Sequence, residues 1–276
     1  WKEVKMKAIS GTIAVSVLLS IILAVVNNMR YIIPEENRKI SDVHIRQGLS
    51  IKEENNKLLK EEKIELLSAH VQSHYIEGIP LIPQLPELPT GCEVTSLTMV
   101  LNYLGCEADK LEIAREYLPK EDLIKDEQGV LYGPDFRYIF PGDPENDTSF
   151  GCFAPCITET ADKYFTEKSI VYSADDISGI SFYDLFDYIA QDIPVIIWST
   201  MNLSETQYVT SWKTNDGKVI SWPKNEHCVV LSGYSYSNNT VQIYDPTNGI
   251  LTLNMEDVKE RYDQLGKNAV LISSVK

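Results

Sequence analysis

PLIPQLPELPTGCEVTSLTMVLNYLG, residues 80–105, leads a proline-stiffened segment into a helix that begins almost at Cys92. Thr90 and Glu93 have the spacing of a capping box, in which the Thr90 hydroxyl accepts from the Glu93 amide and the carboxylate reaches back. Gly105 supplies the usual helix stop. The apolar residues between them recur at helical intervals: Val94, Leu97, Leu101 and Leu104. We therefore expect an amphipathic helix that packs one face on a core.

Cys92 falls in the first turn of this expected helix. Unpaired amides and the positive end of the helix dipole favour a thiolate there, so the position predicts a lowered thiol pKa and a nucleophile. The alternative is structural, because a lone cysteine is often a small buried hydrophobe.

Composition limits the function classes. The chain has 276 residues and a formal net charge of -15, which argues against binding to a phosphate backbone and predicts no nucleic-acid partner. An odd number of cysteines predicts at least one free thiol: Cys92, Cys106, Cys152, Cys156 and Cys228. Their spacings match no zinc motif, so we expect neither a metal nor a cofactor. Cys152 and Cys156 are near enough for a disulfide only if the local backbone permits it.

The amino-terminal region predicts a membrane anchor. Residues 8–26 are an uncharged apolar run of helix-spanning length, and the lysines of residues 1–7 predict a cytoplasmic end before it. The rest of the chain is then extracellular. The alternative is a cleaved signal peptide and a secreted protein. Trp1 in place of methionine suggests that the sequence begins inside a longer chain.

Residues 27–77 are polar and predict a partly helical stalk, and residues 78–276 predict the globular domain. His70 and His74 lie four apart on one possible helical face and could share a metal, but solvated histidines are the simpler interpretation.

The globular domain changes from helical to strand-like patterns along the chain. We expect helices near 109–118 and 181–191 with a long, aromatic-rich loop between them. Strand-like runs follow: 193–200, 206–212, 217–222, 227–236, 240–245 and 268–275. This order predicts an α+β fold, with helices of the first half packed on a C-terminal antiparallel sheet.

Two of these strands bring together residues that suit nucleophilic catalysis. His227 opens one strand and Asp245 closes the next, so both lie at the same edge of an antiparallel pair. An aspartate that orients an imidazole leaves its second nitrogen free to take the proton of Cys92. Gln84 precedes the cysteine and can offer its amide to the oxygen of a tetrahedral intermediate. Taken singly, each residue also has an ordinary structural interpretation.

Five segments together resemble a known family: IPLIPQLPELPTGCEVTSLTMVLNYLG, FPGDPENDTSFGCFAPCITE, IPVIIW, HCVVLSGY and VQIYDPTNG. They resemble cysteine peptidase family 39, the papain-like bacterial enzymes that include double-glycine leader peptidases, in a stand-alone, membrane-anchored extracellular branch. The resemblance implies a papain-like fold, with Cys92 as nucleophile, His227 as general base, Asp245 as orienter and Gln84 as oxyanion donor. Leader peptidases usually sit on ABC exporters, whereas this chain has no Walker motif, so leader processing is not carried over.

The sequence therefore predicts a cysteine-dependent hydrolase, a peptidase that acts outside the membrane through a Cys92 thioester on a peptide or cell-wall substrate. One alternative is a catalytically silent surface binding module that uses the aromatic loop 129–153. A second is a cell-wall amidase or acyltransferase with the same triad, and a third is a purely structural cap on an oligomerising stalk. The pattern does not define an oligomeric state.

Overall fold

The computed structural model describes residues 72–274. The expected anchor at 8–26, most of the expected stalk and His70 lie outside the described residues. Across 72–274, no helix has both the length and the apolar character needed to cross a bilayer.

The expected central helix is α3, Cys92–Tyr103, but its start differs from the prediction. Gly91 is the N-cap and no side chain caps the helix, so the predicted Thr90–Glu93 capping box is wrong. The Thr90 hydroxyl donates instead to the carbonyl of Asn146, and Glu93 accepts from the amide of Cys152. Contacts with a distant loop thus replace a local cap. At the other end Gly105 adopts a positive φ of 81°, which confirms the predicted stop.

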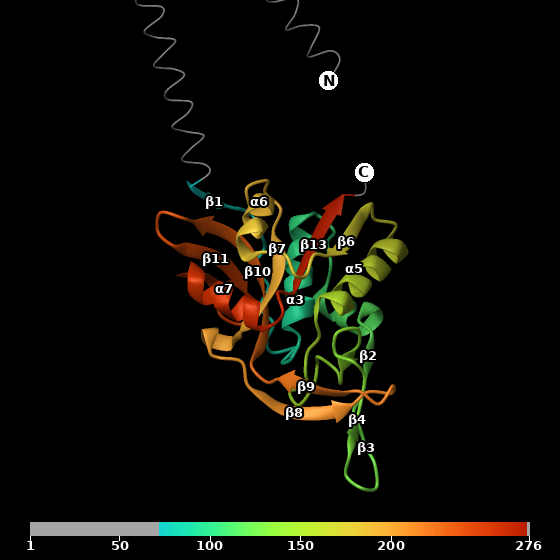
Figure 1. The fold of residues 1–276 in the computed structure, drawn as a ribbon. Helices are drawn as coiled ribbons and strands as arrows, with labels where there is room; N and C mark the ends of the chain where they lie inside the picture. The colour runs from blue at the N-terminus through green and yellow to red at the C-terminus, as the bar shows by residue number, and fades with distance from the viewer. Residues whose placement is uncertain (1–71, 275–276) are drawn as a thin grey trace, which may run out of the picture. The chain divides into compact units, whose positions relative to one another are not determined.

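A central antiparallel sheet follows the order β12-β11-β10-β7-β13-β6, and β1 pairs with β10 (Figure 1). Its strands are β1 Ser73–Tyr75, β6 Tyr172–Asp176, β7 Val195–Thr200, β10 Glu226–Ser235, β11 Thr240–Asp245, β12 Gly249–Asn254 and β13 Ala269–Ser274. All of β10 is buried, including the polar residues Glu226, His227, Ser232 and Ser235. The antiparallel sheet of the predicted α+β fold is therefore confirmed.

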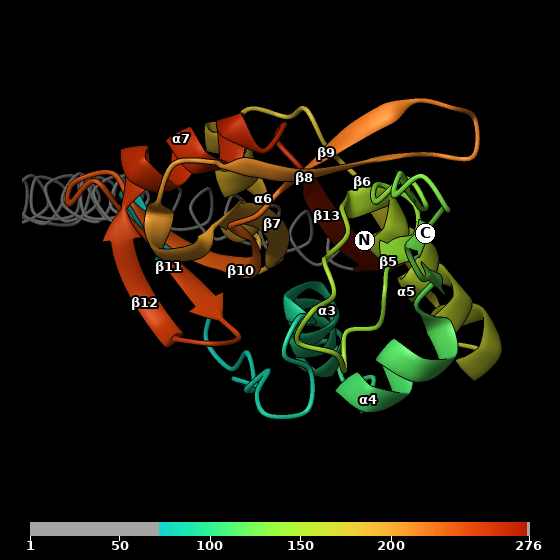
Figure 2. The ribbon, with the colours of Figure 1, turned by 90° about the horizontal axis from the view of Figure 1, so that it is seen from below.

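Helices cover both sides of this sheet. In the two ribbon views α3 and α5, Ala154–Lys168, lie on one side, and α7, Met255–Gln264, lies on the other (Figures 1 and 2). α3 packs against β10, α5 against β6, and α7 against β7. The start of β10 is thereby brought to the amino end of α3.

A second, smaller sheet has the order β3-β4-β8-β9. Its strands are β3 Ile124–Lys125, β4 Leu131–Tyr132, β8 Tyr208–Lys213 and β9 Val219–Pro223, and a separate short pair joins β2 Lys120–Glu121 to β5 Phe140–Pro141. The expected long loop runs through these strands. Phe136 packs edge-on against Trp212 and Trp222, so aromatic packing orders this region.

The two other expected helices are present but irregular. The first is α4, Lys110–Glu112, continued by a π-helical turn over Ile113–Tyr117. The second is a 3₁₀ turn, Phe182–Leu185, followed by α6, Phe186–Ile189.

His74 and the cysteines test two further predictions. His74 lies in β1, within the sheet, rather than on a helical face, so a metal shared with His70 along a helix is not supported. All five cysteines are free, and the possible Cys152–Cys156 disulfide is not formed.

Candidate active site

Cys92 is the first residue of α3, and its sulfur reaches the start of β10. The backbone amide of Cys228 donates to Cys92 Sγ over 3.4 Å, and the thiol donates to Glu93 Oε2 over 3.4 Å. That amide belongs to the peptide bond between His227 and Cys228. The structure therefore places the sulfur at the predicted catalytic strand.

The environment of the thiol differs from the one predicted from a helix start. Burial raises the pKa of Cys92 well above its ordinary value, and the neighbouring Glu93 and Glu226 carboxyl groups raise it further. The Cys228 amide opposes this shift only in part. Our expectation of a lowered resting pKa is therefore wrong, because burial and nearby acids outweigh the helix dipole.

His227 and Asp245 form the close pair that the strand arrangement predicts. His227 Nε2 lies 2.9 Å from Asp245 Oδ1, and both side chains are buried. Burial would raise the pKa of Asp245, but the hydrogen bond and charge of His227 outweigh it, with help from donors on Asn248 and Thr247. The pKa of Asp245 lies well below its usual range, so this carboxylate stays ionised beside the ring.

The His227 imidazole does not form a hydrogen bond with the Cys92 thiol. Within residues 72–274 no hydrogen bond joins His227 to Cys92 Sγ, although the sulfur contacts the very next amide. Because Nε2 faces Asp245, Nδ1 is the nitrogen available to another partner. Consecutive strand residues point to opposite faces, so His227 and Glu226 leave β10 on different sides.

Gln84 is buried close to Asp245 but does not contact the sulfur. Its backbone amide donates to the carbonyl of Pro246 over 2.8 Å, which holds the proline-rich segment beside the turn after β11. Its side-chain amide donates to the Pro89 carbonyl over 3.1 Å, and Oε1 is buried without a partner. In this arrangement Gln84 lies in the region of the triad with one of its two side-chain amide hydrogens donated to Pro89.

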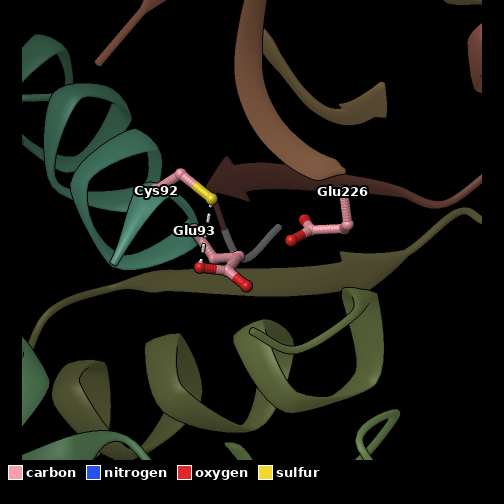
Figure 3. A group of neighbouring side chains, drawn as sticks. All are labelled: Cys92, Glu93 and Glu226. Carbon is pink, nitrogen blue, oxygen red and sulfur yellow. Dashed lines mark hydrogen bonds between the residues drawn. The ribbon is translucent and has the colours of Figure 1, made fainter. Parts of the chain in front are cut away.

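Glu93 and Glu226 are the site residues that the sequence interpretation missed. One oxygen of each carboxyl group and the Cys92 sulfur lie within 4.8 Å of one another (Figure 3). The three atoms have the spacing of metal ligands, although a retained proton also satisfies two buried acids. From the sequence we expected Glu93 to cap a helix and assigned no role to Glu226. Each is the immediate neighbour of a predicted catalytic residue, and this proximity is the signal that could have identified them.

A cavity of about 470 Å³ opens on the His227 side of the strand. The polar residues that line it are Ser199, Thr200, Asn202, His227, Asp245 and Asn248. Aliphatic side chains form the rest of the wall: Leu203, Val229, Ile243, Leu251 and Leu253. An apolar substrate side chain could therefore lie beside the imidazole.

Comparison with known proteins places the chain in a family. Residues 76–270 match the family described as Peptidase_C39 like. The chain belongs to this family. It is 28% identical over 189 residues to the uncharacterized protein YvpB of Bacillus subtilis strain 168, a match that covers 68% of this chain and 70% of YvpB. A crystal structure from Bacillus anthracis, classed as a C39-like peptidase, shares 30% identity with a TM-score of 0.64, over 74% of this chain and 98% of that one.

Membership of the C39-like family confirms the resemblance seen in the sequence. It also supports the C39 peptidase-like fold, in which helices pack on an antiparallel sheet. The membrane-anchored, extracellular branch remains a prediction.

Proposed function

We propose that the protein is a cysteine peptidase that cleaves its substrate through a Cys92 thioester. The proposal is based on the hydrogen bond between His227 and Asp245, whose Nε2 and Oδ1 atoms lie 2.9 Å apart. The backbone amide of Cys228, the residue after His227, donates to the Cys92 sulfur. Family membership supports a cysteine peptidase chemistry. Asp245 orients the ring, His227 acts as general base and Cys92 as nucleophile.

The reaction begins when the thiol leaves Glu93 and turns toward His227. Nδ1 takes the thiol proton, and the sulfur attacks the substrate carbonyl carbon to form a tetrahedral intermediate. The imidazolium returns that proton to the leaving amine as the carbon–nitrogen bond breaks, which gives a thioester. His227 then takes a proton from water, hydroxide displaces the sulfur, and the proton returns to Cys92.

The tetrahedral oxygen needs hydrogen-bond donors. The amide of Cys92 is one of the first amides of α3, which have no acceptor in the preceding turn of the helix. Gln84 would be the second donor, through the side-chain amide hydrogen that is not donated to the Pro89 carbonyl. Both groups would stabilise the negative charge that develops only during reaction.

The cavity beside His227 assigns a substrate preference to this chemistry. Because the imidazole must protonate the leaving amine, the residue that carries this amine lies on the His227 side of the site. We therefore assign the aliphatic cavity to the side chain that follows the cleaved bond. The substrate is then a peptide with a bulky apolar residue at that position.

Mutation of the nucleophile tests the reaction. Cys92→Ala should abolish cleavage of a mixed peptide library, followed by mass spectrometry, because the variant lacks the thiol that forms the thioester in this mechanism. Cys106→Ala is the matched control, since Cys106 is a half-exposed thiol that contacts neither member of the His227–Asp245 pair. Undiminished hydrolysis by Cys92→Ala would contradict the proposal.

The second candidate is a binding module without turnover. The raised pKa of the Cys92 thiol and its hydrogen bond to Glu93 favour this candidate over an always-active enzyme. Wild-type protein that binds library peptides but yields neither products nor a trapped thioester would support the module.

Incubation with purified cell wall separates a peptidase from an amidase. The extracellular, membrane-anchored location is also a proposal, which is based on the apolar run at 8–26.

A further inference from the structure

Glu93 and Glu226 form a closely packed acid pair beside the nucleophile (Figure 3). Glu93 is completely buried and Glu226 is 9% exposed. Gly151 covers them, because a methyl group there would collide with an oxygen of each carboxyl group. The mechanism proposed above uses neither residue, although Glu93 holds the thiol of Cys92.

Few hydrogen-bond donors or positive charges lie beside these two carboxyl groups. Glu93 Oε1 accepts from the Cys152 amide over 2.5 Å, whereas Glu226 Oε1 is buried without any partner. The titratable groups that act on the pair are thiols from three elements: Cys92 on α3, Cys228 on β10 and Cys152 before α5. Among described residues no lysine or arginine forms an ion pair with either acid. His227 adjoins Glu226 in sequence but faces the cavity on the other side of β10.

Two carboxylates this close cannot both ionise in a buried site without a cation. We propose that Glu93 and Glu226 retain one proton between them near neutral pH and, through Glu93, control how readily Cys92 gives up its proton. They are positioning residues for the nucleophile of the proposed function. When Glu93 is neutral it places no charge beside the sulfur; once it ionises, it repels a thiolate and holds the thiol protonated.

The pKa directions agree with this geometry. Burial raises the pKa of Glu93 to about 7, and burial together with Glu93 raises the pKa of Glu226 well above its usual value. Glu226 is therefore the member that keeps the proton, and Glu93 is the member that changes charge near neutral pH. The reactivity of the Cys92 thiol should therefore change with pH at two points: when Glu93 ionises and when the thiol itself ionises.

Alkylation of Cys92 by iodoacetamide as a function of pH tests the proposal without requiring turnover, so it stays informative even if the protein is not a peptidase. Wild type should show a step near pH 7 from Glu93 in addition to the main thiol inflection. Glu93→Gln should remove that step and lower the main inflection by about one pH unit or more, because a like charge is lost. Glu226→Gln should leave the step near pH 7, because Glu226 is already neutral when Glu93 ionises and burial alone raises the pKa of Glu93.

Glu159→Gln is the control, since Glu159 pairs with Lys163 on the exposed surface of α5 and should leave the profile unchanged. A Glu93→Gln profile that keeps the step near pH 7 and the main inflection of wild type would overturn the proposal. If the variants fail to fold, the infrared spectrum of the wild type decides: a protonated glutamic acid that persists at about pH 8 supports the retained proton, and its absence refutes it.

Discussion

Asp245 and Glu93 are buried carboxyl groups on opposite sides of the first residues of β10, and their pKa values are shifted in opposite directions. Asp245 receives hydrogen bonds from His227, Thr247 and Asn248, and its pKa is lowered. Glu93 accepts only from its own backbone amide, the backbone amide of Cys152 and the weakly donating Cys92 thiol, and burial raises its pKa to about 7. The difference shows that the supply of donors, rather than depth alone, decides which acid carries charge.

This difference separates the two halves of the catalytic chemistry. The His227 side has a fixed negative charge that can stabilise an imidazolium. The Cys92 side has acids that disfavour a thiolate. The resting protein therefore holds a neutral thiol on one side of β10 and an oriented imidazole on the other, and the proposed mechanism requires the sulfur to turn toward the imidazole.

Removal of the fixed charge should have the largest effect. Asp245→Asn keeps the side-chain shape but no longer stabilises the imidazolium, so we expect kcat/KM for peptide cleavage to fall by about 10²–10⁴-fold. Asp263→Asn is the control, because Asp263 forms only surface ion pairs with Lys259 and Lys267. Activity within about twofold of wild type would show that the His227–Asp245 pair is structural.

The opposite pKa shifts also predict opposite effects of pH on stability. Asp245, with a lowered pKa, stabilises the fold above the unfolded value near 4, and that contribution is lost as pH falls through the folded pKa. Glu93, with a raised pKa, binds its proton more tightly in the folded state. Its contribution is therefore present below about pH 4 and is lost as pH rises to about 7.

Urea unfolding measured between about pH 4.5 and 7 should separate the two effects. Glu93→Gln should remove a loss of unfolding free energy on the order of 3 kcal/mol across that interval. Asp245→Asn should leave the same interval unaffected and change the dependence only at lower pH. A wild-type stability that does not change between these two pH values would contradict the raised pKa of Glu93.

Local sequence patterns predicted much of the framework. The apolar, β-branched runs of β7, β10 and β11 appear as strands where expected, and the order of His227 and Asp245 on them predicted their 2.9 Å contact. Helix α7 was missed even though Asn254 caps it and Glu256 and Asp257 follow in its first turn. Those residues are a recognisable helix start, so this miss was avoidable.

The acid pair was not predictable by the same means. Glu93 and Glu226 are far apart in the sequence, and only the packing of α3 on β10 brings them together. The failed capping box has the same origin, because the carbonyl of Asn146 and the amide of Cys152 attract Thr90 and Glu93 away from each other. Tertiary contacts of this kind override a local motif without leaving a local signal.

The smallest expected effect concerns substrate choice on the His227 side. Leu251 and its neighbour Ile250 lie on β12, but only Leu251 lines the cavity, while Ile250 is 50% exposed. Leu251→Asn places an amide in the aliphatic wall, so the preference for a bulky apolar residue after the cleaved bond should fall about tenfold. The measurement is kcat/KM for peptide pairs that differ only at that residue.

Ile250→Asn is the matched control, because it makes the same chemical change one residue away on the opposite face of the strand. It should leave the ratio of kcat/KM values unchanged. If Leu251→Asn instead alters the preference for the residue before the cleaved bond, the acyl part of the substrate occupies this cavity. The leaving amine would then approach from the Cys92 side, and the division of roles between the two sides of β10 would be reversed.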